Sequence, residues 1–327
     1  MRSPASRREF LAAMGVLAAT MGPFSRRQAS PAQLIDAAKS PFRIAVINDE
    51  ITQDFGRACE VASQHFGMKW IELRSMWHKN VLNLDTHEIA EAQRLLKKND
   101  LKVTDIAGPL FKVDWPGASK SRFSPTGDQF GASFTFDQQG EVLERSIQLA
   151  KTFGTDRVRC FDFWRLDDQL LYRGAINDKL NEAANKAGKN GVVLVLENEP
   201  ACNTGTGVEA AKVLDAVRSS HLMLNWDPGN AAALGETPYP DGYNLLPKNR
   251  IGHCHCKDVV KKPDGYDWAP MGQGIIDWVG QFSGLKRDGY RHAVSLETHW
   301  RGAVTAEAST EKSWTGMKDE LQKAGAL

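Results

Sequence analysis

Eight short runs rich in β-branched residues, separated by longer amphipathic stretches, constrain the fold of this chain more than any other feature. Helical patterns such as THEIAEAQRLLKKND after the second run and GEVLERSIQLAKTFG before the fourth lie between them. Alternation of this kind predicts parallel strands joined by crossover helices. We expect one α/β domain over residues 40–327, a closed (β/α)8 TIM barrel, with an open eight-stranded sheet as the alternative. The runs are residues 43–49, 69–75, 102–108, 156–163, 191–199, 222–230, 251–258 and 292–300.

Two connections, residues 109–139 and 259–274, are too long for simple loops between a strand and a helix. Loops of this length in a compact domain are usually lids or binding loops. Their aromatic residues suit either stacking on a sugar ring or anchoring of the loop. These residues are Phe111, Trp115, Phe134, Phe136, Tyr266 and Trp268.

The first 30 residues resemble a twin-arginine export signal. Arg7 and Arg8 precede Phe10, Leu11 and a short apolar run. The run is too short to span a bilayer, so we expect an exported, periplasmic protein without a stable membrane anchor in its mature form. An amphipathic N-terminal helix or a tail is the alternative.

The charge balance bears on the partners of the chain. With 41 Lys and Arg against 40 Asp and Glu, the formal charge is +1, and no concentrated positive field is expected. Nucleic acid is therefore not an expected partner. A homo-oligomer is compatible with the sequence. The five cysteines are an odd number, and we interpret most of them as small buried apolar residues.

Four of the predicted strands end on acidic or imidazole side chains: Glu197, Asp227, His255 and Glu297. In a parallel barrel these ends meet at one mouth. An isolated charge after an apolar run is costly to bury, and one divalent cation would satisfy all four groups. Three carboxylates and one imidazole favour Mn²⁺ or Mg²⁺, with Co²⁺ and Zn²⁺ also compatible. The alternative is salt bridges to Arg or Lys across the mouth.

The segment GHCHCKD, residues 252–258, contains two histidines and two cysteines in alternation. Strand periodicity places His253 and His255 on the inner face, and it turns Cys254 and Cys256 toward the helices. His255 is nearer the strand end and is the better ligand. We expect His253 to pack in the layer beneath.

Six short motifs follow one another along the chain: WIELR at 70–74, LEN at 196–198, NWDPGNA at 225–231, HCHCKD at 253–258, MGQGIIDW at 271–278 and LET at 296–298. Taken together, they resemble the xylose isomerase-like barrel superfamily, in particular its sugar phosphate isomerase/epimerase group. The resemblance implies a metal held by Glu197, Asp227, His255 and Glu297, with Glu197 and Glu297 also acting as the acid/base pair.

The chain departs from this pattern at positions that concern substrate contacts more than metal binding. Asn230 stands where epimerases often have His, Lys261 where they often have Arg, and Gln273 where an acidic residue is usual. We interpret three lysines as a solvated basic cluster or as an anion-binding site: Lys257, Lys261 and Lys262. Glu72 is expected to pair with Arg74 or to bind a substrate hydroxyl. The candidate substrate contacts are Glu72, Glu199, Asn230, Lys257, Lys261, Trp268 and His299.

The predicted function is a metal-dependent sugar isomerase or epimerase acting on a small carbohydrate. A carboxylate would remove a proton next to a carbonyl and give an enediolate. One alternative is elimination from a 3-keto-glycoside at the same site, and another is a non-catalytic, metal-containing sugar-binding protein. The endonuclease branch of the superfamily is disfavoured because it needs additional histidines, and only His78 is available near the second strand.

Overall fold

The computed structural model describes residues 40–125 and 133–327, and it contains all eight predicted strands in one sheet. The spatial order is β1-β12-β9-β8-β7-β6-β5-β2, with parallel neighbours throughout. A parallel bridge between Ile47 and Glu72 joins the two edges. The (β/α)8 TIM barrel is confirmed, and the open sheet is wrong. The strands are β1 Arg43–Val46, β2 Trp70–Leu73, β5 Lys102–Leu110, β6 Arg157–Cys160, β7 Val193–Glu197, β8 Leu222–Trp226, β9 Ile251–Cys256 and β12 Ala293–Leu296.

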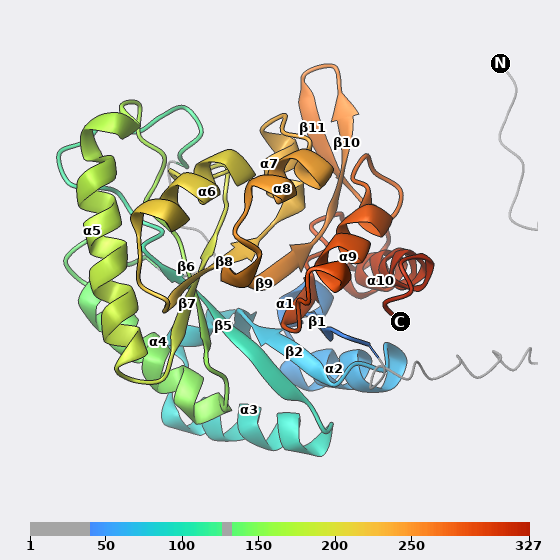
Figure 1. The fold of residues 1–327 in the computed structure, drawn as a ribbon. Helices are drawn as coiled ribbons and strands as arrows, with labels where there is room; N and C mark the ends of the chain where they lie inside the picture. Colours follow the sequence, from blue (N-terminus) through green and yellow to red (C-terminus); the bar gives the residue numbers. More distant parts are fainter. Residues whose placement is uncertain (1–39, 126–132) are drawn as a thin grey trace, which may run out of the picture. The chain divides into compact units, whose positions relative to one another are not determined.

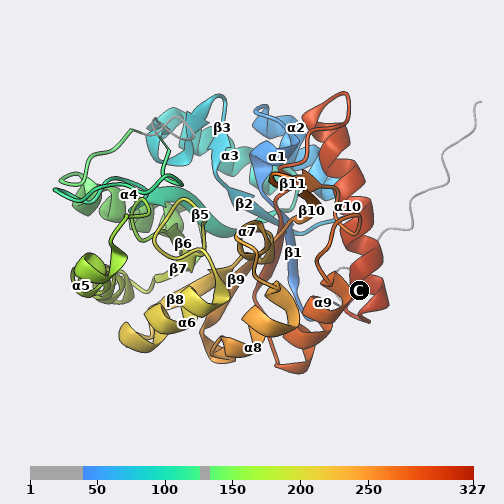
Figure 2. The same cartoon turned by 90° about the horizontal axis from the view of Figure 1, so that it is seen from above.

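Helices surround the strands (Figures 1 and 2). The two helical patterns of the sequence become α3 and α4. Asp85 and Glu88 form a capping box at the start of α3, and Gly154 ends α4 with φ 72°, a conformation that favours glycine. The helices are α1 Asn48–Ile51, α2 Phe55–Glu60, α3 Thr86–Lys98, α4 Gln139–Phe153, α5 Gln169–Gly188, α6 Gly207–Ala216, α7 Pro228–Ala233, α8 Tyr243–Leu245, α9 Trp278–Arg287 and α10 Ala306–Lys323.

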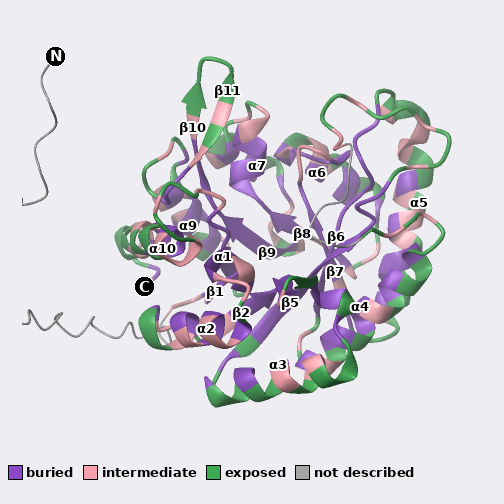
Figure 3. Ribbon diagram, turned by 180° about the vertical axis from the view of Figure 1, so that it is seen from behind, coloured by how far each residue is buried: buried purple, intermediate pink, exposed green. Residues whose placement is uncertain are grey.

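The barrel strands are buried almost throughout, whereas the outer faces of the helices are exposed (Figure 3). All five cysteines are buried and free, which confirms the burial predicted for most of them. Cys254 and Cys256 belong to the apolar core, while His253 and His255 contact polar groups inside the barrel. The alternation of β9 therefore follows the expected phase.

The long connection after β9 is a regular antiparallel hairpin rather than an irregular loop. Strands β10 Asp258–Lys262 and β11 Gly265–Ala269 form it, and it projects from the barrel in Figure 1. A second short hairpin, β3 Ser75–Met76 with β4 Lys79–Asn80, follows β2.

Aromatic side chains in the connection after β5 pack around Phe163, which follows β6. Trp115 and Phe136 lie 4.8 and 5.7 Å from the ring of Phe163, and Phe111 lies 5.1 Å from it. For these three residues, anchoring of the loop is the interpretation that the contacts favour. The remainder of this connection includes residues 126–132, which lie outside the described part.

The export signal expected at residues 1–30 also lies outside the described residues and stays a prediction. In the part of the chain that the structure describes, no helix combines the length and apolar character needed to cross a membrane.

Candidate active site

The four predicted ligands meet at the carboxyl ends of four neighbouring strands. Glu197 ends β7, Asp227 follows β8, His255 lies in β9 and Glu297 follows β12. One ligand atom from each lies within 4.8 Å of the others, and all four residues are buried. Asp227 also begins α7, where its Oδ1 accepts a hydrogen bond from the backbone N–H of Asn230 at 2.9 Å. The tertiary structure thus brings together residues that are 100 positions apart in sequence.

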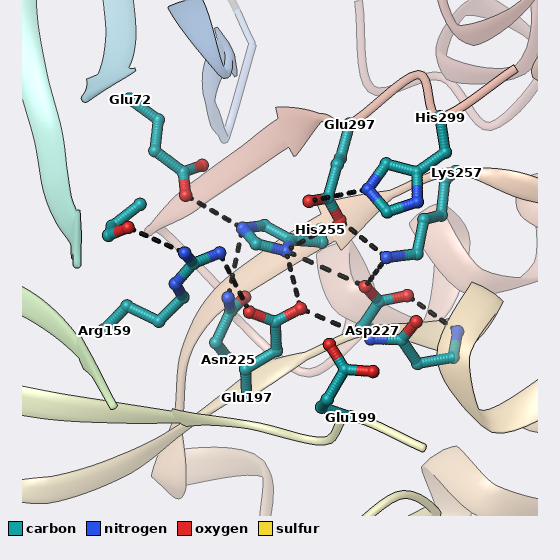
Figure 4. A network of polar contacts seen from close by, with 12 residues as sticks. Glu72, Arg159, Glu197, Glu199, Asn225, Asp227, His255, Lys257, Glu297 and His299 are labelled. Atoms are coloured by element: carbon teal, nitrogen blue, oxygen red, sulfur yellow. Dashed lines mark hydrogen bonds and ion pairs between the residues drawn. The ribbon is translucent and has the colours of Figure 1, made fainter. Parts of the chain in front are cut away.

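His255 lies at the centre of this group (Figure 4). Its Nε2 lies 2.9 Å from Glu72 Oε1 and 3.1 Å from Nδ2 of Asn225. The contact with the carboxylate, which can only accept, favours a proton on Nε2. Its Nδ1 lies 3.4 Å from Glu197 Oε1, 3.7 Å from Asp227 Oδ2 and 3.3 Å from Glu297 Oε2. This nitrogen has no hydrogen-bond partner among the described residues although it is fully buried. An imidazole nitrogen aimed at three carboxylates fits a divalent cation.

Two buried arginines hold the two glutamates; the sequence analysis missed Arg159 and expected Arg74 to pair with Glu72. Arg159, on β6, donates to Glu197 Oε2 at 3.1 Å. Arg74, one residue beyond β2, donates to Glu297 Oε1 at 2.7 Å and also to Glu50 at 2.6 Å. The signal was present, since Arg159 alternates with apolar residues in RVRC and therefore has a fixed phase on its strand.

Lys257 is the third cation of the site. Its Nζ lies 2.6 Å from both Asp227 Oδ2 and Glu297 Oε2, and the residue is only 2% exposed. The interpretation of a solvated basic cluster is therefore wrong for Lys257, whereas Lys261 and Lys262 are exposed on the hairpin. Lys257 follows His255 by two residues, so the phase that turns His255 inward also turns Lys257 inward.

Burial and the neighbouring charges act against each other on these groups. Burial raises the pKa of Glu197 and of Glu297, but the adjacent cations outweigh it and hold both pKa values below their ordinary range. Burial lowers the pKa of His255, but the negative charges of Glu72, Glu197 and Glu297 outweigh this effect. The net pKa of His255 is therefore well above its ordinary value. The carboxylates are therefore ionised, and without a cation the imidazole is protonated.

A family model described as xylose isomerase-like TIM barrel matches residues 59–320 of the chain. The chain belongs to the xylose isomerase-like TIM barrel family. L-ribulose-5-phosphate 3-epimerase UlaE of Escherichia coli O139:H28 (strain E24377A / ETEC) is 24% identical to it over 200 residues, which cover 57% of this chain and 65% of that relative.

Two solved structures illustrate the shared fold. The IOLI protein with a binding zinc atom aligns with a TM-score of 0.68 at 19% identity, over 86% of this chain and 99% of that one. L-ribulose 3-epimerase aligns with a TM-score of 0.60 at 16% identity, over 86% and 97%. The similarity of this xylose isomerase-like barrel to both is a similarity of fold.

The other predicted contacts of this xylose isomerase-like barrel lie at different depths. Asn230 donates to Glu197 Oε1 at 3.3 Å, His299 Nε2 lies 3.2 Å from Glu297 Oε1, and the ring of Trp268 lies 4.9 Å from that of His299. Glu199 pairs with Lys112 at 2.9 Å. Lys261 is exposed and faces Tyr266 across the hairpin.

Glu72 lies deeper than expected, in a polar layer beneath His255. Its hydrogen bond is to His255, while Arg74 contacts Asp49, Glu50 and Glu297. His253, predicted to pack in this layer, is fully buried there, 3.7 Å from Glu72 Oε2 and 3.1 Å from Asn225. Burial lowers the pKa of His253 to about 3, so its imidazole is neutral. From this layer Glu72 and Asn225 both contact Nε2 of His255 and orient its imidazole.

His78 is exposed on the turn between β3 and β4. Among the described residues it belongs to none of the groups whose atoms are close enough to share a metal. This placement disfavours the multi-histidine site of the endonuclease branch.

Proposed function

We propose that the protein is a metal-dependent carbohydrate isomerase or epimerase that removes a proton next to a carbonyl. The observation that carries the proposal is Nδ1 of His255, which makes no hydrogen bond within the described residues and faces the carboxylates of Glu197, Asp227 and Glu297 at 3.3 to 3.7 Å. Relatives named as ribulose epimerases support the same class of reaction.

Glu197, Asp227, His255 and Glu297 would hold one divalent cation. Three carboxylates and one imidazole favour Mn²⁺, with Mg²⁺, Co²⁺ or Zn²⁺ as further candidates. Such a cation, when bound, supplies Lewis acidity to a substrate carbonyl and the hydroxyl beside it.

Glu197 and Glu297 are the proposed acid/base pair. Both are ionised, and each is held by an arginine, so one carboxylate can accept the carbon-bound proton while the other stays in position. Return of the abstracted proton to the neighbouring carbon gives an isomer. An epimer requires the second carboxylate to have taken up a proton beforehand and to donate it to the opposite face, which leaves the first carboxylate protonated. Lys257 and His299, both in contact with Glu297, lie where they can donate to an oxyanion that develops on the substrate.

Elimination from a 3-keto-glycoside is the second candidate, because it begins with the same proton removal. It differs in its products, since the carbon–oxygen bond to the leaving group breaks and free alcohol is released. Export through the twin-arginine pathway, proposed from Arg7 and Arg8, would favour glycosides as substrates.

Metal content and proton exchange test the proposal together. We expect about one equivalent of metal in the wild type after reconstitution with Mn²⁺, and little in Asp227→Asn. Glu297→Gln should keep part of the metal but lose roughly 10²–10⁴-fold in deuterium exchange into ketoses in D₂O. Asp100→Asn is the matched control, because Asp100 pairs with Lys69 on the exterior and has φ 52°, which asparagine tolerates. Metal without exchange would indicate a sugar-binding protein, and no metal would end the proposal.

A further inference from the structure

Barrels of this type often hold a phosphate group in the loops after the seventh and eighth strands, with backbone N–H groups as donors. In this chain those strands are β9 and β12. Carboxylates of the chain itself lie at both places. Asp258 follows the seventh strand, and Glu50 reaches the loop after the eighth.

Asp258 accepts hydrogen bonds from the glycine-rich loop that follows the hairpin. Its Oδ2 accepts from the N–H groups of Gly272 and Gly274 at 3.1 and 3.0 Å, and its Oδ1 accepts from Ile276 at 3.3 Å and Val259 at 3.0 Å. Converging N–H groups of this kind are the usual cradle for an anion. Asp258 is 1% exposed, and a Cβ on Gly274 would lie 2.1 Å from its Oδ1. The cradle is therefore filled by the chain.

Glu50 occupies the corresponding position in the loop after the eighth strand. Its Oε2 accepts from the backbone N–H of His299 at 3.2 Å and from the guanidinium of Arg301, and its Oε1 accepts from Arg74 at 2.6 Å. Glu50 is 1% exposed. A phosphate at this position would have to compete with a buried carboxylate for the same donors.

The buried cations of the site are matched with carboxylates in the same way. Lys257 pairs with Asp227 and Glu297, Arg159 with Glu197, and Lys112 with Glu199. A dianionic phosphate brought close to these pairs would add negative charge without adding a cation.

We propose that the substrate is an uncharged sugar or glycoside without a phosphate group. This inference rests on the proposed sugar chemistry of the same site, and it distinguishes the chain from its relative named for a sugar phosphate. The metal would supply positive charge at the carbonyl end of the substrate.

The first test compares a matched pair of substrates. Mn²⁺-loaded wild type is incubated in D₂O with L-ribulose and, separately, with L-ribulose 5-phosphate, and deuterium incorporation is followed by NMR. We expect kcat/KM to be at least tenfold higher for the free sugar. A preference for the phosphate would overturn the inference while leaving the proposed proton abstraction intact.

The second test does not depend on activity. Inorganic phosphate is titrated into metal-free wild type and Asp258→Ala, against chloride at equal ionic strength, and Tm is measured. We expect no shift in the wild type and an increase of several degrees in Asp258→Ala, where the N–H cradle is open. A phosphate-induced rise in the Tm of the wild type as large as that of the variant would overturn the inference.

The two tests separate the possible failures. Absence of exchange with both sugars would count against the proposed reaction, and the phosphate titration of the wild type would still decide the inference. If Asp258→Ala does not fold, the phosphate titration of the wild type alone decides the inference.

Discussion

At the scale of single residues, the site is a balance between buried carboxylates and the cations that hold them. Lys257 is the clearest case, because its ammonium contacts Asp227 and Glu297, two of the four proposed metal ligands. Burial alone lowers the pKa of Lys257, but the carboxylates raise it above its ordinary value, so the ammonium stays charged. The Lys257 ammonium and a bound metal ion would therefore compete for the same carboxylate oxygens of Asp227 and Glu297.

Replacing Lys257 by Met should destabilise the metal-free protein and at the same time tighten metal binding. Loss of a partner from a buried ion pair is expected to lower the unfolding free energy of the metal-free protein by about 3–5 kcal/mol. Metal should bind roughly tenfold more tightly, because a competing charge is gone. Lys261→Met, an exposed lysine on the adjacent hairpin, is the control. Differential scanning calorimetry with and without Mn²⁺ measures both effects, and equal behaviour of the two variants would contradict the role of Lys257.

Metal affinity should rise with pH. The pKa of His255 is raised in the metal-free protein, so a cation at Nδ1 must displace a proton from this nitrogen. Below the raised pKa we expect about one proton released per metal and an affinity that increases up to tenfold per pH unit. Calorimetric titration of Mn²⁺ in buffers of different ionisation enthalpy counts the protons. No proton release would mean that His255 is not a ligand.

At the scale of elements, the connection after β9 is organised by one side chain. Asp258 ties the start of the hairpin to the MGQG loop, so hairpin and loop form one unit over the barrel mouth. Trp268, on β11, lies 5.1 Å from Lys257 Nζ and also contacts His299. The long segment is therefore a structured hairpin that brings Trp268 beside the site.

Gly274→Ala tests this unit. The new methyl group would lie 2.1 Å from Asp258 Oδ1 and 2.4 Å from the carbonyl oxygen of Val259, so the loop must shift. We expect a loss of about 2 kcal/mol in unfolding free energy, measured by urea denaturation. Gly140→Ala in α4, where nothing lies within 4 Å of the new methyl group, should instead be neutral or stabilising by up to about 1 kcal/mol. Similar losses in both variants would argue against the close contact at Gly274.

At the scale of the whole molecule, the amino-terminal end of the barrel also contains a charged link. Arg157, on β6, lies 3.3 Å from Nδ1 of His292, which precedes β12, and 3.4 Å from the carbonyl oxygen of Gly252 on β9. These contacts join three strands across the end of the barrel opposite the site.

This link predicts a pH dependence of global stability. Burial, Arg157 and Arg43 lower the pKa of His292 to about 4 from 6.5. Between these values the unfolded chain binds the proton more readily, so the stabilisation is present above pH 6.5 and is lost as pH falls toward 4. His292→Gln should reduce the loss of unfolding free energy between pH 7.5 and 5 by about 1 kcal/mol, since partial exposure screens the effect. Denaturant unfolding at the two pH values measures it, and identical pH dependence would contradict it.

Much of this protein follows from sequence period and position. The eight β-branched runs became the eight strands, mostly shortened by one to four residues at their ends, because alternation of strand and helix leaves few compact arrangements. Glu197, Asp227, His255 and Glu297 could be grouped beforehand because parallel strands place their carboxyl ends at one mouth. The inward phase of His253 and His255 followed from the two-residue period of a strand.

Tertiary structure alone decided which partners these groups have and how deep each one lies. Arg74 meets Glu297 across 223 positions, and Glu72 meets His255 across 183, so no local pattern reports either contact. Phase indicates that Lys257 faces inward, but its depth depends on the neighbouring strands, which surround it with carboxylates. Asp258 likewise fills an anion cradle only because the hairpin folds back and brings the MGQG loop to it. The sequence by itself determined the barrel and the grouping of the ligands, since both depend on periodicity; the pairing of charges depends on distances between separate strands, which exist only after the barrel has closed.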